Sequence, residues 1–269
     1  MKLFGAGALV TLAVLGGSIA LTGCDSTDPA SREGRYDGPA KSLGDGTVHT
    51  FATLDEDGTP LTFGVRITES ALATLPAHGG PHGSVETVLA LPNNAAIAPY
   101  NHVSFDWQPQ GHEPDGVYTI PHFDVHFYLM SEAERATIDP AAPDFDAKAG
   151  RAPEAQYVPA GYVPTPGAVP MMGAHWVDPS SPEFTPAGFS RTFLYGVWDG
   201  RMTFVEPMIT NAFIESVKTL PSQSVSFPVP QPQAFEKAGY YPTAYSVRYD
   251  ADAQAYDITL EGLTKQASN

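Results

Sequence analysis

Short apolar runs that alternate with polar residues recur along most of the chain, separated by turn-forming residues. A period of two is typical of strands with one face in a core. Antiparallel hairpins are expected over residues 47–68, 193–206 and 245–260, and the Asp199-Gly200 turn gives the second the strongest hairpin signal. Further strands are expected at residues 85–91, 102–107 and 117–130. The pattern predicts a mainly β fold, an antiparallel β-sandwich or a barrel-like domain with a few short helices.

Helical signals are short and few. Residues 69–75 and 211–220 are expected to be helices, the second after Thr210 as an N-cap, and Ser131-Glu132-Ala133-Glu134 forms a capping box. Residues 139–170 are rich in Pro and Ala and weakly periodic, so we expect a long surface excursion, of the kind that covers a site or a neighbouring subunit.

The first residues follow a different pattern. The apolar run from Leu3 to Leu21 follows Lys2 and ends in Leu21-Thr22-Gly23-Cys24, which matches the bacterial lipobox. This predicts a lipoprotein signal peptide at residues 1–23 and a lipid on Cys24 after cleavage. The protein is therefore expected in the bacterial cell envelope, anchored to a membrane and facing outside the cytoplasm, with inner and outer membrane both left open.

The mature chain is expected to have two parts. Residues 24–39 are polar and loop-forming and predict a flexible tether. Residues 40–269 are expected to form a single β-rich domain of a length that suits one large all-β unit.

Composition excludes several function classes. Cys24 is the single cysteine, so once it is acylated no thiol is left for a disulfide, a metal or a nucleophile. The formal net charge of −16 opposes binding to nucleic acid or to anionic lipid headgroups, which leaves the lipid as the contact with the membrane. The chain has no G-x-S-x-G motif, which argues against a serine hydrolase of the α/β class.

The strand from residue 122 carries the strongest chemical signal. Its alternation places His122, Asp124 and His126 on one face and apolar residues on the other. A polar face made of histidines and an acid predicts binding of a divalent metal. On a regular strand His122 and His126 lie about 13 Å apart, whereas neighbours two apart lie about 7 Å apart. One ion held by both histidines therefore requires a bulge or strong coiling; otherwise Asp124 joins one of them or accepts a hydrogen bond from an imidazole.

Other parts of the chain supply further candidates. His175 follows Gly-Ala, which permits close backbone approach, and Glu206 ends an apolar run before a proline. His112 and Glu113 precede the histidine strand and could cap the same pocket. The predicted metal ligands are His122, Asp124, His126 and His175. Glu206, as ligand or base, and Glu113 are the predicted catalytic acids; the ion is Zn²⁺, Mn²⁺, Fe²⁺ or Cu²⁺, and enzyme activity is left open.

A non-catalytic function is the alternative. In it the histidines are hydrogen-bonded in a polar core or in a homo-oligomer interface, or aromatic residues such as Trp107 and Trp176 line a small-molecule pocket. This alternative predicts no stoichiometric metal.

Several distinctive motifs occur in order: GHEP from Gly111, PHFDVHFY from Pro121, PMMGAHWVD from Pro170 and YGVWDGRMTFVEPMIT from Tyr195. Through these motifs, over roughly residues 46–263, the chain resembles an uncharacterised bacterial family, a domain of unknown function of exported and lipid-anchored proteins. The structural representative of that family is a sigma-E-regulated thermophile protein. The resemblance implies a β-rich fold, an envelope location and self-association, but no activity. Gln108 stands where the family often has Asn.

Overall fold

The computed structural model describes Met1 and residues 32–80, 83–95 and 97–269. The predicted signal peptide and Cys24 lie outside the described residues. Residues 32–269 belong to one compact unit. Within the described residues, no helix combines the length and the apolar character that crossing a membrane requires.

Two antiparallel sheets, each of seven strands in the described part of the chain, form this unit. In the first sheet the order is β1-β3-β4-β15-β14-β12, and β2 pairs with β3. Its strands are β1 (Gly34–Asp37), β2 (Lys41–Leu43), β3 (Gly46–Leu54), β4 (Pro60–Thr68), β12 (Ser224–Pro228), β14 (Ala244–Asp250) and β15 (Ala255–Glu261). The strand β1 lies within the predicted tether, so the sheet begins before the predicted boundary at residue 40.

The second sheet has the order β5-β6-β7-β11-β10-β9-β8. Its strands are β5 (Val85–Ala90), β6 (His102–Gln108), β7 (His122–Tyr128), β8 (Val163–Pro164), β9 (Ala174–Val177), β10 (Arg191–Trp198) and β11 (Arg201–Thr210). Strands β13 (Gly239–Tyr241) and β16 (Thr264–Gln266) form a separate pair. The strand expected over residues 117–130 is shorter than predicted, because residues 114–118 form hydrogen-bonded turns ahead of Pro121.

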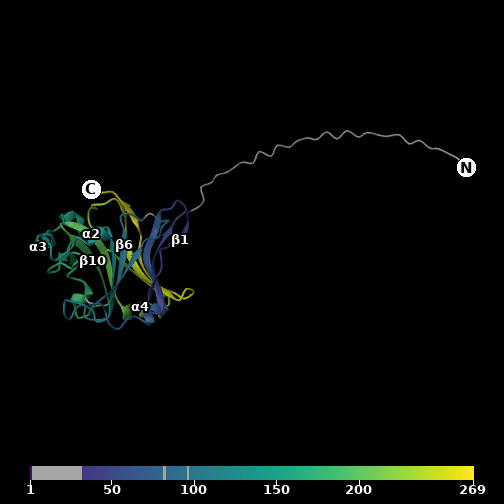
Figure 1. Ribbon diagram of the computed structural model, residues 1–269, viewed down its shortest axis with the longest axis horizontal. Coiled ribbons are helices and arrows are strands. Elements are labelled where there is room, and N and C mark those ends of the chain that lie inside the picture. The colour runs from purple at the N-terminus through teal and green to yellow at the C-terminus, as the bar shows by residue number, and fades with distance from the viewer. Residues whose placement is uncertain (2–31, 81–82, 96) are drawn as a thin grey trace. The chain divides into compact units, whose positions relative to one another are not determined.

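The helices are short. They are α1 (Glu69–Ala73), α2 (Glu132–Arg135), α3 (Phe145–Ala149) and α4 (Asn211–Val217), with 3₁₀ turns η1 (Ala155–Tyr157) and η2 (Pro182–Phe184). The predicted capping box at Ser131 is present, and the Thr210 hydroxyl accepts a hydrogen bond from the Phe213 N–H at the start of α4. Figure 1 shows α3 beside the second sheet, near β10, and α4 at one end of the sheets.

The apolar faces of the two sheets pack against each other and form the main core. Phe63 of the first sheet meets Phe127 of the second with ring centroids 5.1 Å apart, and Phe193 meets Tyr245 at 5.3 Å. Each aromatic ring buried in this way contributes about 2 to 3 kcal/mol through the apolar surface that it removes from water. In the described residues neither sheet closes into a barrel, so the fold is mainly β with two packed antiparallel sheets, as the alternation predicted.

The outer face of the second sheet is also covered. Every residue of β6 and β7 is buried, on both faces of these strands. A second apolar cluster lies over this outer face and consists of Tyr118, Val177, Phe189, Leu194 and Met208. Tyr118 and Phe189 come from the segments before β7 and before β10, so loops bury the polar face of the histidine strand.

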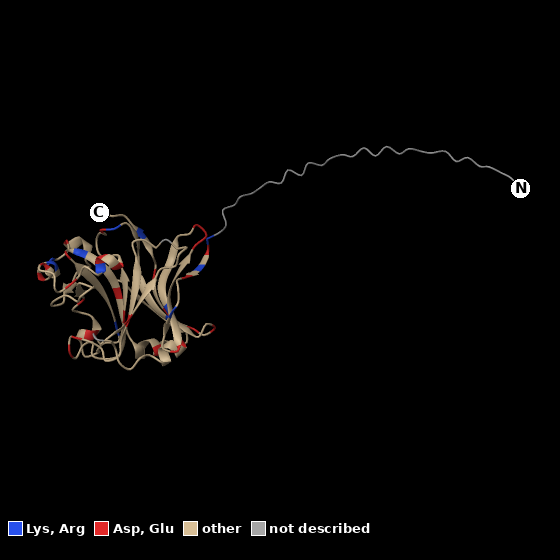
Figure 2. Ribbon diagram, in the orientation of Figure 1, with Lys and Arg blue, Asp and Glu red and all other residues tan. Residues whose placement is uncertain are grey.

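Figure 2 shows that the acidic residues are spread over the loops and short helices of the unit.

Candidate metal centres

A row of buried polar side chains follows the outer face of the second sheet. Its members are His102, Ser104, Asp106, Gln108, His122, Asp124, His126 and Glu206. In the antiparallel register Asp106 lies directly opposite Asp124, and Ser104 lies opposite His126. Taking an ionisable group out of water costs several kcal/mol unless it is paired. The row therefore requires compensating charge.

The first group of facing side chains is the Glu206 cluster, which consists of His126, His175 and Glu206. The Nε2 atom of His126 lies 3.5 Å from Glu206 Oε1, and the Nε2 atom of His175 lies 3.6 Å from Glu206 Oε2. These residues come from β7, β9 and β11. Both the His126 and the Glu206 side chains are 1% exposed, whereas that of His175 is 17% exposed.

A carboxylate behind His126 fixes the orientation of its ring. Asp106 Oδ2 lies 3.0 Å from His126 Nδ1, on the side of the ring away from Glu206. The Ser104 hydroxyl donates a hydrogen bond of 2.8 Å to the other Asp106 oxygen. A buried carboxylate against the second ring nitrogen is the arrangement that orients metal-binding histidines in many proteins.

The environment of the Glu206 cluster strongly shifts its protonation. Burial lowers the pKa of His126, but the carboxylates of Glu206 and Asp106 outweigh this effect and raise the pKa to about 9. Burial raises the pKa of Glu206 to about 7 and also raises that of Asp106. Burial, and then the charge of His126, lower the pKa of His175 to about 3. His175 is therefore a neutral imidazole at neutral pH, the form that ligates metals.

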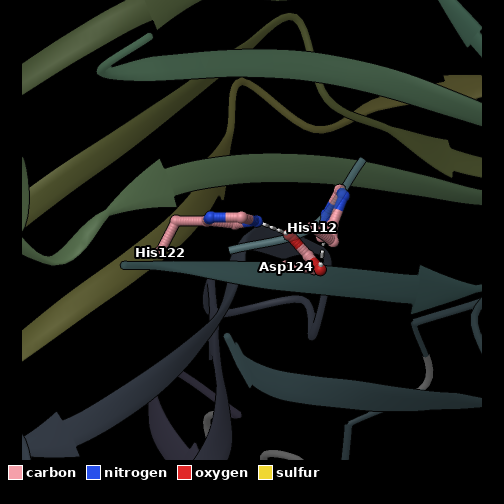
Figure 3. A group of neighbouring side chains, drawn as sticks. All are labelled: His112, His122 and Asp124. Atoms are coloured by element: carbon pink, nitrogen blue, oxygen red, sulfur yellow. Dashed lines mark ion pairs between the residues drawn. The ribbon is translucent and has the colours of Figure 1, made fainter. Parts of the chain in front are cut away.

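The second group is the Asp124 cluster, which consists of His112, His122 and Asp124. Figure 3 shows their side chains pointing toward one another. His122 Nε2 lies 3.0 Å from Asp124 Oδ1, and His112 Nε2 lies 3.4 Å from Asp124 Oδ2. The Gln108 side-chain amide donates a hydrogen bond of 2.9 Å to the same Oδ2 atom.

The charges of the Asp124 cluster stabilise one another. Burial raises the pKa of Asp124, but the imidazoles of His122 and His112 outweigh burial and hold it well below its usual value. Burial lowers the pKa of His112, but its contact with Asp124 outweighs that effect and raises the pKa to about 9. A positive charge facing Asp124, whether a proton or a metal ion, is therefore strongly favoured.

Several buried atoms of both clusters have no hydrogen-bond partner among the described residues. They are both ring nitrogens of His126, Oε2 of Glu206, Oδ2 of Asp106, Nε2 of His122 and Oδ1 of Asp124. Each lies 3.0 to 3.6 Å from an atom of another titratable side chain, but without the geometry of a hydrogen bond. For Nε2 of His126 with Oε2 of Glu206, and for Nε2 of His122 with Oδ1 of Asp124, this is the arrangement of ligand atoms around a bound ion, which point at a common centre rather than along an N–H bond.

The structure separates the predicted ligands into two clusters. His122 and Asp124 lie together, and His126 lies with His175 instead. The regular strand geometry keeps the two histidines of β7 apart, so Asp124 joins only one of them. The Glu206 carboxylate faces both histidines of its cluster, as a ligand would. The Glu113 carboxylate takes part in neither cluster: this residue is exposed, and only its backbone carbonyl contacts His112.

Asp106 is the main functional candidate that the sequence patterns did not single out. In β6 the polar residues Ser104, Asp106 and Gln108 alternate with Val103, Phe105 and Trp107. This alternation, together with pairing of β6 to β7, would have placed Asp106 on the histidine face.

The sequence left open a small-molecule pocket lined by aromatic residues, and the structure has a cavity of about 550 Å³. Its lining includes Phe145, Arg151 and Trp176 but no ligand atom of either cluster. Trp176 follows His175 in β9, so the two side chains point to opposite faces of that strand.

The fold and its site define a β protein with two packed sheets and two partly buried groups of histidines and carboxylates. Residues 55–107 match the family model described as "TTHB210-like: Hypothetical protein TTHB210", which confirms the resemblance to an uncharacterised family with a thermophile representative. The matched segment carries β4, β5 and most of β6, including Asp106, but neither cluster. Searches of curated proteins and of solved structures found no match.

Proposed function

We propose that the protein binds a divalent transition-metal ion through His126, His175 and Glu206, as a lipid-anchored protein of the bacterial cell envelope. The observation that carries the proposal is the set of facing ligand atoms in the Glu206 cluster, in which His126 and Glu206 are buried and His175 is partly buried. Three of them, one from each residue, lie within 4.8 Å of one another.

The spacing of these atoms fits a bound ion. Zinc–nitrogen and zinc–oxygen bonds of about 2.0 to 2.2 Å in a tetrahedron place neighbouring ligand atoms about 3.3 to 3.6 Å apart. The nitrogen–oxygen distances in the cluster are close to these values, at 3.5 Å from His126 to Oε1 of Glu206 and 3.6 Å from His175 to Oε2 of the same carboxylate. Two imidazoles and one carboxylate suit Zn²⁺, Mn²⁺, Fe²⁺ or Cu²⁺, and three protein ligands leave a coordination position for water or substrate.

Each residue has a separate role in this proposal. Glu206 and His126 supply buried ligand atoms, and Asp106 holds the His126 ring so that Nε2 faces the ion. His175 is the ligand nearest to solvent, with a side chain that is 17% exposed. An ion here would offset the charge of Glu206, whose burial otherwise favours protonation.

Elemental analysis of the purified full chain tests the proposal. The parent is incubated with Zn²⁺, Mn²⁺, Fe²⁺ or Cu²⁺, freed of excess metal and compared with His175→Gln and Glu206→Gln. His102→Phe is the matched control, because His102 lies in the same polar row but in neither cluster. We expect each of the first two variants to lose one equivalent of metal and His102→Phe to lose none.

Two results would contradict the proposal. The first is that the parent takes up none of the four metals. The second is that His175→Gln and Glu206→Gln fold and contain as much metal as the parent. His126 would then be a protonated imidazole between Asp106 and Glu206, and the cluster would be a buried network of ion pairs that stabilises the fold without a metal. This is the non-catalytic alternative predicted from the sequence.

The anchor is tested separately, because Cys24 lies outside the described residues. Mass spectrometry of the chain expressed in a bacterium with lipoprotein processing should find a mature N-terminus at Cys24 that carries diacylglycerol. Cys24→Ala should remain unprocessed and unlipidated. A parent that is cleaved elsewhere, with an unmodified cysteine, would remove the anchor from the proposal and leave the metal site untouched.

A further inference from the structure

Both histidine rings of the Asp124 cluster contact a backbone carbonyl oxygen through Nδ1. His122 Nδ1 lies 2.6 Å from the Ile120 carbonyl oxygen, and His112 Nδ1 lies 2.6 Å from the Glu113 carbonyl oxygen. A carbonyl oxygen only accepts hydrogen bonds, so each Nδ1 atom is the one that carries a proton. In the neutral ring the Nε2 atom then presents a lone pair.

Both of these lone pairs face one carboxylate. His122 Nε2 is directed at Asp124 Oδ1 and His112 Nε2 at Asp124 Oδ2, at 3.0 and 3.4 Å. Lone pairs and a carboxylate at such distances repel one another, and burial strengthens the repulsion because it lowers the effective dielectric constant. The arrangement therefore requires positive charge between the rings and the carboxylate.

The geometry distinguishes two sources of that charge. Protonated rings would donate N–H bonds to Asp124, yet neither His122 Nε2 nor Asp124 Oδ1 has a hydrogen-bond partner among the described residues. Both residues are buried, at 0% and 4% exposed. Gln108 saturates one lone pair of Oδ2, so Oδ1 is the oxygen left without a donor. A metal ion beside Oδ1 would satisfy both of these unpaired atoms without requiring N–H geometry, and His112 would supply the third ligand atom.

We propose that His112, His122 and Asp124 form a second metal site, separate from the site at Glu206. The two sites have no ligand in common, so each can fail while the other stands. Two imidazole nitrogens and one carboxylate again suit a divalent transition metal such as Zn²⁺ or Cu²⁺. The rings of Tyr118 and Phe189 lie against His122, at centroid distances of 6.5 and 5.2 Å, and form an apolar wall on that side.

The second site differs from the first in its access to solvent. His112 lies in the segment between β6 and β7, and its side chain is 37% exposed. At the Glu206 cluster the most exposed ligand side chain is that of His175, at 17%. A more exposed ligand opens a shorter path for water and chelators, so this ion exchanges faster than the one at Glu206.

Titration with Co²⁺, followed by its visible absorption and by elemental analysis, tests the second site in the full chain. We expect two equivalents in the parent, of which one is removed first by a weak chelator. His112→Gln should lose that fast equivalent and keep the slow one, whereas His175→Gln should lose the slow one. Asp124→Asn should behave as His112→Gln does.

Glu113→Gln is the matched control, because it removes a charge beside His112 but keeps the backbone carbonyl that contacts the ring. It should retain both equivalents. A single equivalent in the parent, lost in His175→Gln and kept in His112→Gln, would overturn the second site and leave the proposed function intact. A single equivalent lost only in His112→Gln would do the reverse, and no equivalent at all would overturn both.

Discussion

Phe204 fills the space that a side chain at Gly196 would need: a Cβ atom at position 196 would overlap the Phe204 ring. The same ring contacts both imidazoles of the Glu206 cluster, with centroids 4.7 Å from His126 and 5.2 Å from His175. His175 also lies opposite Gly196 in the pairing of β9 with β10. The absence of a side chain at Gly196 therefore sets the position of both candidate ligands.

Gly196→Ala should weaken the Glu206 cluster. The new methyl group displaces Phe204, which moves the two imidazoles that pack against it. Crowding of a packed site costs about 1 to 3 kcal/mol, so the free energy of unfolding should fall by that amount. Metal affinity at the Glu206 cluster should fall with it. Urea denaturation and metal titration measure the two effects.

Gly150→Ala is the control for that substitution. A Cβ atom at position 150 would meet Asp146 O at 3.4 Å, which is ordinary contact, and Gly150 ends α3 with a helical φ of −81°. This variant should keep the parental stability and metal content. Equal behaviour of the two alanine variants would show that Phe204 does not position the histidines.

Asp106→Asn should weaken metal binding without removing a ligand. Asp106 places a carboxylate oxygen 3.0 Å from Nδ1 of His126, and an asparagine in its place can turn its amide toward the ring and disturb that orientation. Loss of a partner behind a metal-binding histidine typically costs about 10- to 100-fold in metal affinity. Competition with a chelator of known affinity measures the change.

Ser104→Ala is a milder change at the same place, because it removes the hydroxyl that contacts Glu86 and the other oxygen of Asp106 but leaves the carboxylate beside His126. We expect a smaller loss of affinity than in Asp106→Asn. An unchanged affinity in Asp106→Asn would mean that Asp106 has no part in orienting His126.

His102 should make the protein less stable in acid. Burial, and then the charge of Arg135, lower the pKa of His102 from 6.5 to about 4. Between these values the unfolded chain binds more protons than the folded chain, so stability falls as the pH falls from 6.5 to 4. His102 is 2% exposed, and a shift of this size corresponds to about 2 to 3 kcal/mol at pH 4.

His102→Phe tests this effect, because phenylalanine keeps a ring to stack on Tyr128 but cannot titrate. Urea denaturation from pH 7 to pH 4 should show a smaller loss of stability in the variant than in the parent. His175, whose pKa is lowered to about 3, continues to contribute in both proteins. Identical pH dependence in parent and variant would contradict a neutral, buried His102.

The sequence predicts much of this fold and part of the site. Strict alternation identified the hairpins and the polar face of β7, because the side-chain period of two depends only on the local backbone. The grouping of His126 with His175 could not be derived, since it depends on the order of β7, β11, β10 and β9 in the sheet. Alternation also could not show that loops bury this polar face, because a buried polar face and a solvated one have the same period.

Arg66 provides a test of stability on the sheet that carries neither cluster. Its guanidinium binds both carboxylate oxygens of Asp257, at 2.6 and 2.7 Å, and also reaches Asp250 at 2.7 Å. Arg66 and Asp257 lie directly opposite each other in β4 and β15. Arg66→Met keeps most of the aliphatic stem but leaves Asp257, which is 4% exposed, without its main partner. Unpaired buried charge is costly, so the free energy of unfolding should fall by about 2 to 3 kcal/mol while metal content stays unchanged.

Asp37→Ala is the control, because it removes a solvent-exposed partner of Arg35 in the same sheet and should cost less than about 1 kcal/mol. Similar small losses in both variants, measured by urea denaturation, would show that solvent screens the Arg66 pair as it screens a surface ion pair.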